Sequence, residues 1–208
     1  MLNIKKHHGD YYHLYFEVRN IFIIHGSYGH PEENWFPWLK KELETLKHQV
    51  IVPKFPIHSD TTSNHRLNEW IEEFLKYKEF VNKETIIVAH SRGCSFCLQL
   101  LPVLNMKINS MFFVGPFIDY DQWRPEVYTE YDSFQAKPYL WKKVRKLVDH
   151  IEIFQSTDDV IPVCEGQFIA YWLHAEFILV KNAKHFNVAE DPSYDHFPLL
   201  LDRIKNRL

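Results

Sequence analysis

The sequence has too few cysteines for a disulfide framework. It contains 3 cysteines among 208 residues, and an odd number in a chain of this length is typical of a reducing compartment. Residues 1–18 carry lysines but neither an apolar signal core nor a small-residue cleavage site. No later segment reaches the apolar length that a bilayer requires. We therefore expect an unexported, cytoplasmic protein with no membrane partner.

The chain also lacks an excess of positive charge. Its 24 Lys and Arg against 27 Asp and Glu give a net charge of −3 at pH 7, so no broad positive field attracts nucleic acid. It contains neither the G-x-x-x-x-G-K phosphate loop nor the G-x-G-x-x-G dinucleotide motif, and its histidines are scattered without metal-ligand spacing. We therefore expect no nucleic-acid partner, no cofactor and no metal.

Short runs of β-branched and aromatic residues alternate with longer segments of helical periodicity. The runs typical of strands buried on both faces are residues 21–24, 49–52, 85–89, 110–115, 150–154 and 176–180. The segments with apolar residues at every third or fourth position are residues 34–47, 64–77, 92–104, 139–148, 164–173 and 197–208. This alternation predicts an α/β fold with a doubly wound, mostly parallel sheet of about six strands. The length and the 46% hydrophobic content fit a single domain over residues 1–208.

Two segments depart from this alternation. Residues 10–18 are either an extra edge strand folded back on residues 21–24 or a loosely held terminus, so residues 1–20 form an N-terminal extension. Residues 116–140 are crowded with Tyr, Trp, Phe and Pro and have no clear period. Long aromatic loops above a parallel sheet often line a ligand pocket, which makes Trp123 a candidate substrate contact; a packed surface excursion is the alternative.

A serine follows one of the buried runs where a helix is expected to begin. Ala89-His90-Ser91-Arg92-Gly93 has the spacing of the nucleophile elbow G-x-S-x-G, with alanine in the first small position. Small flanking residues let a strained strand-to-helix turn lift the serine Oγ clear of its neighbours. The sequence therefore predicts Ser91 as a nucleophile, the alternative being a serine that caps the helix.

A serine nucleophile needs a base and an acid that fixes this base. Asp158 and Asp159 follow the run at 150–154, and His185 follows the run at 176–180. The order Ser, Asp, His is the order that a nucleophile-elbow enzyme requires. The pattern Asp-x-x-(Val/Ile)-Pro favours Asp158 as the acid, whereas counting from the end of the strand favours Asp159. We predict Asp158 and keep Asp159 as the alternative.

The oxyanion formed by attack needs backbone donors. One donor is the N–H of Arg92, and the other is expected from Ser27 in the HGSYG segment that follows residues 21–24. An ordinary glycine turn is the alternative for this segment. Four further residues are candidate substrate contacts because they adjoin these groups: His25, Gly26, Tyr28 and His90.

Two features beside the elbow have more than one interpretation. The Arg92 side chain either steers a substrate carboxylate or, as we favour, meets an acidic side chain at the surface. Cys94 and Cys97 form C-x-x-C, but they follow the elbow on a helix that packs against the sheet. We therefore expect core packing in preference to redox chemistry or zinc binding.

The ordered set of motifs resembles a known family. HGSYGHPEENWFPWLKKELE, TIIVAHSRG, VGPF, IEIFQSTDDVIP and KHF occur in the order seen in the small, lidless α/β hydrolases similar to retinoblastoma-binding protein nine. The resemblance covers most of the chain from Ile21 onward and departs from the family at Ala89 and in the extension at residues 1–20. It implies an α/β-hydrolase fold with no large cap domain and a triad of Ser91, His185 and Asp158 or Asp159.

The resemblance also implies a serine hydrolase acting on small esters or amides. The sequence thus predicts an esterase-like enzyme for small-molecule acyl substrates that works through an acyl-enzyme. A protein-binding module with an idle triad and an acyltransferase or thioesterase with the same triad remain open. Because Cys164 and Glu165 are adjacent, the family's Leu-x-Cys-x-Glu motif is absent and no retinoblastoma-protein partner is expected.

Overall fold

A parallel six-stranded sheet organises the chain. The computed structural model describes residues 3–4, 14–15, 17–58, 66–118, 134 and 139–208. Neighbouring strands of the sheet are parallel and follow the order β4-β3-β5-β6-β7-β8. These strands are β3 (Asn20–Ile24), β4 (Gln49–Ile51), β5 (Ile86–His90), β6 (Ile108–Val114), β7 (Val148–Ser156) and β8 (Glu176–Val180). Each coincides with a predicted run, so the predicted α/β class is confirmed.

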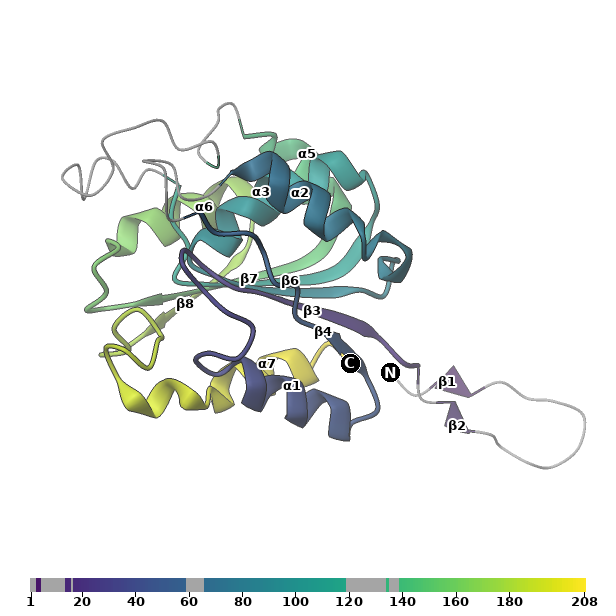
Figure 1. Ribbon diagram of the computed structural model, residues 1–208, viewed down its shortest axis with the longest axis horizontal. Coiled ribbons are helices and arrows are strands. Elements are labelled where there is room, and N and C mark those ends of the chain that lie inside the picture. The colour runs from purple at the N-terminus through teal and green to yellow at the C-terminus, as the bar shows by residue number, and fades with distance from the viewer. Residues whose placement is uncertain (1–2, 5–13, 16, 59–65, 119–133, 135–138) are drawn as a thin grey trace, which may run out of the picture.

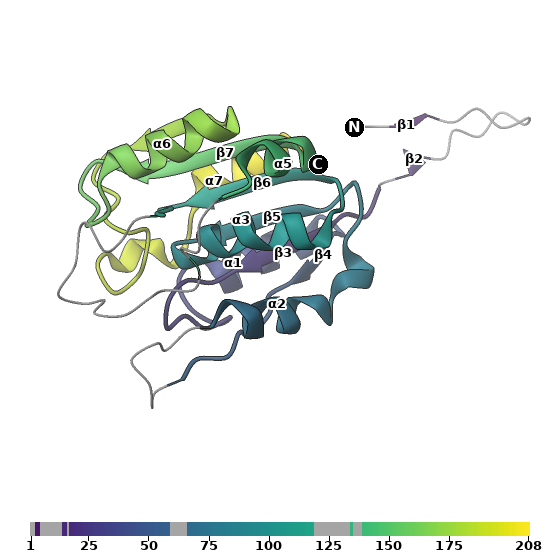
Figure 2. The same cartoon turned by 90° about the horizontal axis from the view of Figure 1, so that it is seen from above.

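Helices cover both faces of the sheet, as Figures 1 and 2 show. One face carries α1 (Phe36–Thr45) and α7 (Pro198–Lys205). The other carries α2 (Leu67–Leu75), α3 (Arg92–Leu104), α5 (Trp141–Leu147) and α6 (Val163–Leu173). Short 3-10 turns lie at Lys78–Phe80 and Pro192–Asp195. The helices coincide with the predicted periodic segments.

Side-chain alternation divides the interior into two cores. In β5, Ile87 and Ala89 belong to the core shared with α2 and α3, whereas Ile86 and Val88 belong to the core shared with α1 and α7. Successive residues of a strand point to opposite faces. A strand that faces a core on both sides therefore needs an unbroken apolar run, which is the pattern seen in the sequence.

The strand order reverses direction between β3 and β5. The chain passes from β3 outward to β4 and then returns to the other side of β3 as β5. Ligands of open α/β sheets bind where the strand order reverses in this way. Ile24 lies opposite Ala89 in the register of the two strands, so the loops that follow them emerge side by side.

The N-terminal residues pair among themselves. β1 (Asn3–Ile4) and β2 (Leu14–Tyr15) form an antiparallel ribbon that lies apart from the six-stranded sheet (Figures 1 and 2). Within the described residues, the extra edge strand against residues 21–24 is therefore not formed. The assignment of residues 1–208 to a single domain remains a prediction.

Part of the predicted aromatic loop lies outside the described residues. This part comprises residues 119–133 and 135–138 and includes Trp123, whose role as a substrate contact stays a prediction. Among the helices that the structure describes, none has both the length and the apolar character needed to cross a bilayer.

Candidate active site

Ser91 stands on a strained turn between β5 and α3. Its backbone has φ +55° and ψ −124°, a region that non-glycine residues seldom adopt and that is enriched at active sites. A Cβ atom on Gly93 would lie 2.7 Å from the carbonyl oxygens of Ile24 and His25, so the second small position of the elbow requires glycine. Ser91 occupies the N-cap position of α3, but its side chain makes no capping hydrogen bond. The alternative of a capping serine is therefore not supported.

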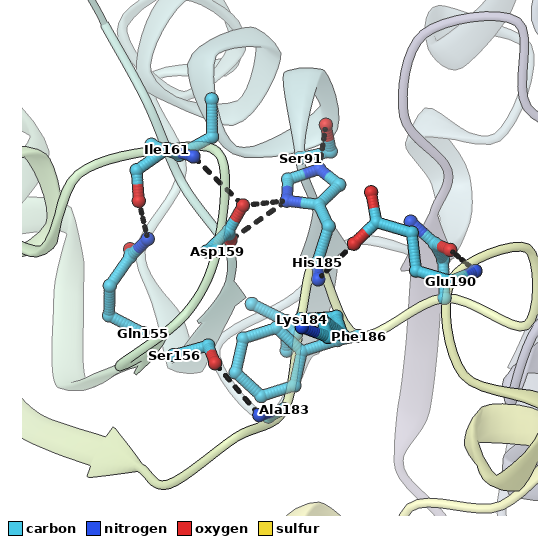
Figure 3. A network of polar contacts seen from close by, with 12 residues as sticks. Ser91, Gln155, Ser156, Asp159, Ile161, Ala183, Lys184, His185, Phe186 and Glu190 are labelled. Carbon is cyan, nitrogen blue, oxygen red and sulfur yellow. Dashed lines mark hydrogen bonds and ion pairs between the residues drawn. The ribbon is translucent and has the colours of Figure 1, made fainter.

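His185 joins Ser91 to Asp159 (Figure 3). Its Nε2 lies 2.9 Å from Ser91 Oγ, and its Nδ1 lies 2.9 Å and 3.0 Å from the two carboxylate oxygens of Asp159. The Asp159 side chain is fully buried, and that of His185 is 13% exposed. A carboxylate on Nδ1 favours the tautomer that leaves Nε2 free to accept the serine proton. The structure thus brings together three residues that lie far apart in the sequence.

These contacts favour Asp159, the alternative acid, over the predicted Asp158. Asp158 accepts hydrogen bonds from Ser156 Oγ at 2.8 Å and from the Lys184 N–H at 2.9 Å, and it pairs with Lys184 Nζ at 2.8 Å. The hydrogen bond from the Lys184 side chain is the main reason why the pKa of Asp158 falls to about 2. Asp158 therefore braces the loop before His185, and Asp159 faces the imidazole.

The loop that carries His185 is strained and anchored on both sides. Lys184 and Phe186 have φ values of +49° and +54°. The His185 N–H donates to Glu190 Oε2 at 3.1 Å, and His90 Nε2 lies 2.8 Å from the His185 carbonyl oxygen, to which it donates. These contacts hold a costly backbone conformation and orient the imidazole. The Glu190 contact was not predicted, because the loop has no periodic pattern.

The loop that carries Asp159 has its own support from β7. Ile161 N–H donates to Asp159 Oδ1 at 2.9 Å, and Gln155 Nε2 donates to the Ile161 carbonyl oxygen at 3.1 Å (Figure 3). Gln155 is completely buried. In the sequence, the signal for this supporting role is the polar Gln155 near the end of a largely buried strand.

The segment after β3 packs directly against Ser91. A Cβ atom on Gly26 would lie 2.8 Å from Ser91 Cβ and 3.2 Å from Ser91 Oγ, so the backbone reaches the nucleophile only because residue 26 is glycine. The Gly29 N–H donates to the Gly26 carbonyl oxygen at 3.2 Å, and Tyr28 within this turn has φ +55°. Ser27 follows Gly26 in the turn. Tyr28 is 58% exposed, which fits its prediction as a substrate contact.

His25 and His90, which were predicted as substrate contacts, are buried and contact the surrounding loops. His25 is fully buried; its Nδ1 lies 2.9 Å from the Gly26 carbonyl oxygen, and its Nε2 accepts from the Phe55 N–H at 3.1 Å. Burial lowers the pKa of His25 to about 4 and that of His90 to about 3. Both imidazoles are therefore neutral near pH 7 and hold backbone atoms of the surrounding loops.

The Arg92 side chain is also buried, contrary to the surface position that we favoured. It is 1% exposed, and its Nε donates to Ser27 Oγ at 2.6 Å. Cys94 and Cys97 are fully buried, and burial raises the pKa of both thiols. Buried thiols with raised pKa values are unreactive, so the prediction of core packing for the two cysteines is confirmed.

One group of possible metal ligands lies elsewhere in the described part of the chain. His150, Glu152 and Glu176 bring their ligand atoms within 4.8 Å of one another, which the scattered histidines did not predict. Arg203 Nε lies 2.7 Å from Glu152, and its Nη2 lies 2.5 Å from Glu176. Because the guanidinium already neutralises both carboxylates, the group is an ion-pair network, and it is unsuited to a cation.

A parallel sheet covered on both faces, with a serine on a strained turn after a central strand, defines an α/β hydrolase. Residues 21–206 match the family described as "Serine hydrolase". The chain belongs to this family and is a hydrolase.

Relatives and solved structures agree with this assignment. The chain is 26% identical to the hydrolase YdeN of Bacillus subtilis (strain 168) over 188 residues, which cover 89% of this chain and 94% of the relative. It is 23% identical to the serine hydrolase RBBP9 of Rattus norvegicus, with 75% of this chain and 80% of the relative covered. The crystal structure of the ydeN gene product from B. subtilis superposes with a TM-score of 0.79 at 24% identity, covering 91% of this chain and 98% of that one.

A further solved structure supports the fold. The α/β hydrolase MGS-MChE2, from a lagoon-sediment metagenome, has a TM-score of 0.66 at 17% identity and covers 97% of this chain. Together with the described residues, in which no separate cap domain is present, these likenesses confirm the predicted fold class.

Proposed function

We propose that the protein is an esterase-like serine hydrolase that cleaves small acyl esters or amides through a triad of Ser91, His185 and Asp159. The observation that carries the proposal is the pair of contacts of His185, 2.9 Å from Ser91 Oγ on one side and 2.9 Å from Asp159 on the other. Hydrogen-bond reach between nucleophile, base and orienting acid is the geometric requirement for this chemistry.

In this mechanism Ser91 Oγ attacks the acyl carbonyl while His185 Nε2 takes its proton. Asp159 keeps the imidazole in the correct tautomer and stabilises its positive charge. The backbone N–H groups of Ser27 and Arg92 stabilise the oxyanion of the tetrahedral intermediate. His185 then returns the proton to the leaving alcohol or amine, which departs. A water molecule then attacks the acyl-enzyme, with His185 again as the base, and releases the carboxylic acid and free Ser91.

The electrostatic surroundings favour this use of His185. His90 stands beside the His185 ring, with the two ring centroids 5.0 Å apart. Because burial keeps His90 neutral, it adds no positive charge to oppose the imidazolium that forms during attack. This chemistry supports an acyl compound as the substrate, and we propose a small molecule. The cytoplasmic location suggested by the three cysteines stays a prediction.

Labelling with a fluorophosphonate probe and intact-mass detection tests the proposal. Wild type should gain one probe adduct, because a fluorophosphonate reacts with an activated serine. Ser91→Ala should gain none, and His185→Ala should label far more slowly because the serine loses its base. Ser193→Ala, which changes an exposed serine outside the proposed triad, is the matched control and should label like wild type.

The labelling result also separates the competing functions. Absence of labelling in well-folded wild type contradicts the proposal and favours a protein-binding role with an idle triad. If wild type labels, p-nitrophenyl acetate hydrolysis with and without added alcohol or thiol acceptors distinguishes a hydrolase from an acyltransferase. Transfer to the acceptor in preference to water would favour the acyltransferase.

A further inference from the structure

Arg92 places a buried guanidinium immediately after the nucleophile. The residue is 1% exposed and begins α3. Removing a charged group from water is costly unless hydrogen bonds and nearby groups compensate for the loss of solvation. One of the contacts of this side chain reaches the loop of residues 25–29, called here the oxyanion loop because it carries Ser27.

The Arg92 side chain bridges the two segments that supply the proposed oxyanion donors. Its Nε donates to Ser27 Oγ at 2.6 Å, across 65 positions of sequence. A hydrogen bond from a charged donor is shorter and stronger than a neutral one. The turn that carries Ser27 includes Tyr28 at φ +55°, a conformation that costs free energy and favours relaxation. The hydrogen bond from Arg92 to Ser27, the residue before Tyr28, opposes this relaxation.

The guanidinium is itself fixed by aromatic side chains. Its Cζ lies 5.9 Å from the ring centroid of Phe117 and 5.2 Å from that of Phe134. Both rings are almost completely buried, and Ser95 Oγ donates to the Phe117 carbonyl oxygen from the same helix as Arg92. Cation–π contacts in a desolvated setting hold a guanidinium in place. Arg92 therefore links these aromatic side chains to the oxyanion loop and is held in place at both ends.

We propose that the Arg92 side chain is a positioning residue that holds the Ser27 N–H in the geometry required for oxyanion binding. Residue 92 then contributes twice, through its backbone N–H and through the hydrogen bond from its side chain to Ser27. The inference rests on the proposed hydrolase function and deepens it. Burial of the guanidinium argues against the alternative in which Arg92 recognises a carboxylate of the substrate.

Steady-state hydrolysis of p-nitrophenyl acetate by two variants tests the proposal. Ser27→Ala removes the acceptor, and Arg92→Lys keeps the charge but has a carbon atom in place of Nε. Loss of an oxyanion donor lowers kcat by about 10²–10³-fold, and displacement of a donor should cost less, about tenfold. KM should change little, because the ground-state carbonyl depends less on these donors. The inhibition constant of phenylboronic acid, which forms a tetrahedral adduct with an active serine, should rise by a similar factor.

Three comparisons separate positioning from a general structural role. Ser27→Thr retains the hydroxyl and should restore most of the lost kcat. The double variant Ser27→Ala/Arg92→Lys should be no slower than the slower single variant, because both changes remove the same contact. Arg203→Lys makes the same substitution in the ion pair with Glu152, whose Oε2 accepts from Arg203 Nε at 2.7 Å, and should leave kcat unchanged.

The outcomes distinguish this inference from the function on which it rests. If wild type hydrolyses the ester and labels at Ser91 while folded Ser27→Ala retains full kcat and full affinity for phenylboronic acid, the positioning role is wrong and the hydrolase function stands. The positioning role is also wrong if the kcat losses of the two single variants multiply in the double variant. If Arg92→Lys fails to fold, the Ser27→Ala and Ser27→Thr pair decides. A wild type that neither labels nor hydrolyses overturns both.

Discussion

Two adjacent aspartates after β7 have different surroundings and different expected roles. The Asp159 side chain is fully buried against His185, whereas the Asp158 side chain is 28% exposed and pairs with Lys184. A carboxylate that orients a catalytic imidazole must be shielded and held in one direction. A carboxylate paired with a lysine at the surface contributes little to stability. Substitution of each aspartate by the isosteric asparagine distinguishes their roles.

Asp159→Asn should lower kcat for p-nitrophenyl acetate by about 10³–10⁴-fold, because the amide stabilises the wrong tautomer of His185. Asp158→Asn is the matched control. It keeps an oxygen that can accept from Ser156 and Lys184, so kcat should stay within about threefold of wild type, since an exposed ion pair contributes little. A larger loss in Asp158→Asn than in Asp159→Asn would restore Asp158 as the acid.

At the residue scale, the sequence predicts which residue types meet but leaves the direction of each side chain open. Asp158 and Asp159 follow the same strand, and only the path of the turn decides which one faces His185. His90 and Arg92 flank Ser91, and their charge or polarity suggested contact with substrate or solvent. Their burial depends on partners from distant segments, Ser27 and the His185 carbonyl, which periodicity does not reveal.

At the element scale, the start of α1 supports the loop that follows β8. Trp35, at the N-cap of α1, is fully buried and donates from Nε1 to the Phe186 carbonyl oxygen at 3.1 Å. Phe186 follows His185 and has φ +54°. The indole therefore connects a helix on one face of the sheet with the loop of the proposed base.

Trp35→Phe should lower kcat about tenfold because the His185 loop loses this anchor. Leaving the buried Phe186 carbonyl without its donor costs about 1–3 kcal/mol of unfolding free energy. Thr85→Val is the control, because Thr85 is also fully buried and its Oγ1 accepts from the Asn82 N–H at 2.8 Å, just before β5 and at the end of that strand opposite Ser91. Urea denaturation should show losses of similar size, with kcat reduced only in Trp35→Phe. Equal loss of kcat would contradict the anchoring role.

The elements themselves could be predicted because their pattern is local. Each strand of the six-stranded sheet overlaps a run rich in β-branched and aromatic residues, and helices such as α1 bury Phe36, Leu39 and Leu43 at a spacing of three and four. The ribbon of β1 and β2 could not be assigned in this way. Its strands have two residues each, which is too short for an alternation that would fix their partner.

At the scale of the whole molecule, two buried histidines make the stability of the fold sensitive to acid. Burial lowers the pKa of His25 to about 4 and that of His90 to about 3, whereas both titrate near pH 6.5 when the chain unfolds. Below about pH 6.5 the unfolded state therefore binds protons that the native state does not. Their contribution to stability is full above this pH and is lost as the pH falls through the native pKa values.

The free energy of unfolding should fall between pH 6.5 and pH 4 by up to about 1.4 kcal/mol per pH unit for each histidine. Urea denaturation at pH 7, 6 and 5 measures this slope. His90→Gln, whose amide can still donate to the His185 carbonyl oxygen, should reduce the slope by up to half, since one of the two protons no longer binds. A slope identical to that of wild type would show that His90 is not the titrating group.

The proposed nucleophile and base follow strands that differ in burial and in position within the sheet. Ser91 follows β5, an interior strand whose five residues are all buried. His185 follows β8, which lies at the edge of the sheet and has only exposed or half-buried residues. Edge elements with few buried contacts open locally at a smaller free-energy cost than the core. Brief detachment of this edge would displace His185 and stop catalysis while the rest of the sheet stays folded, so activity would be lost before the fold is.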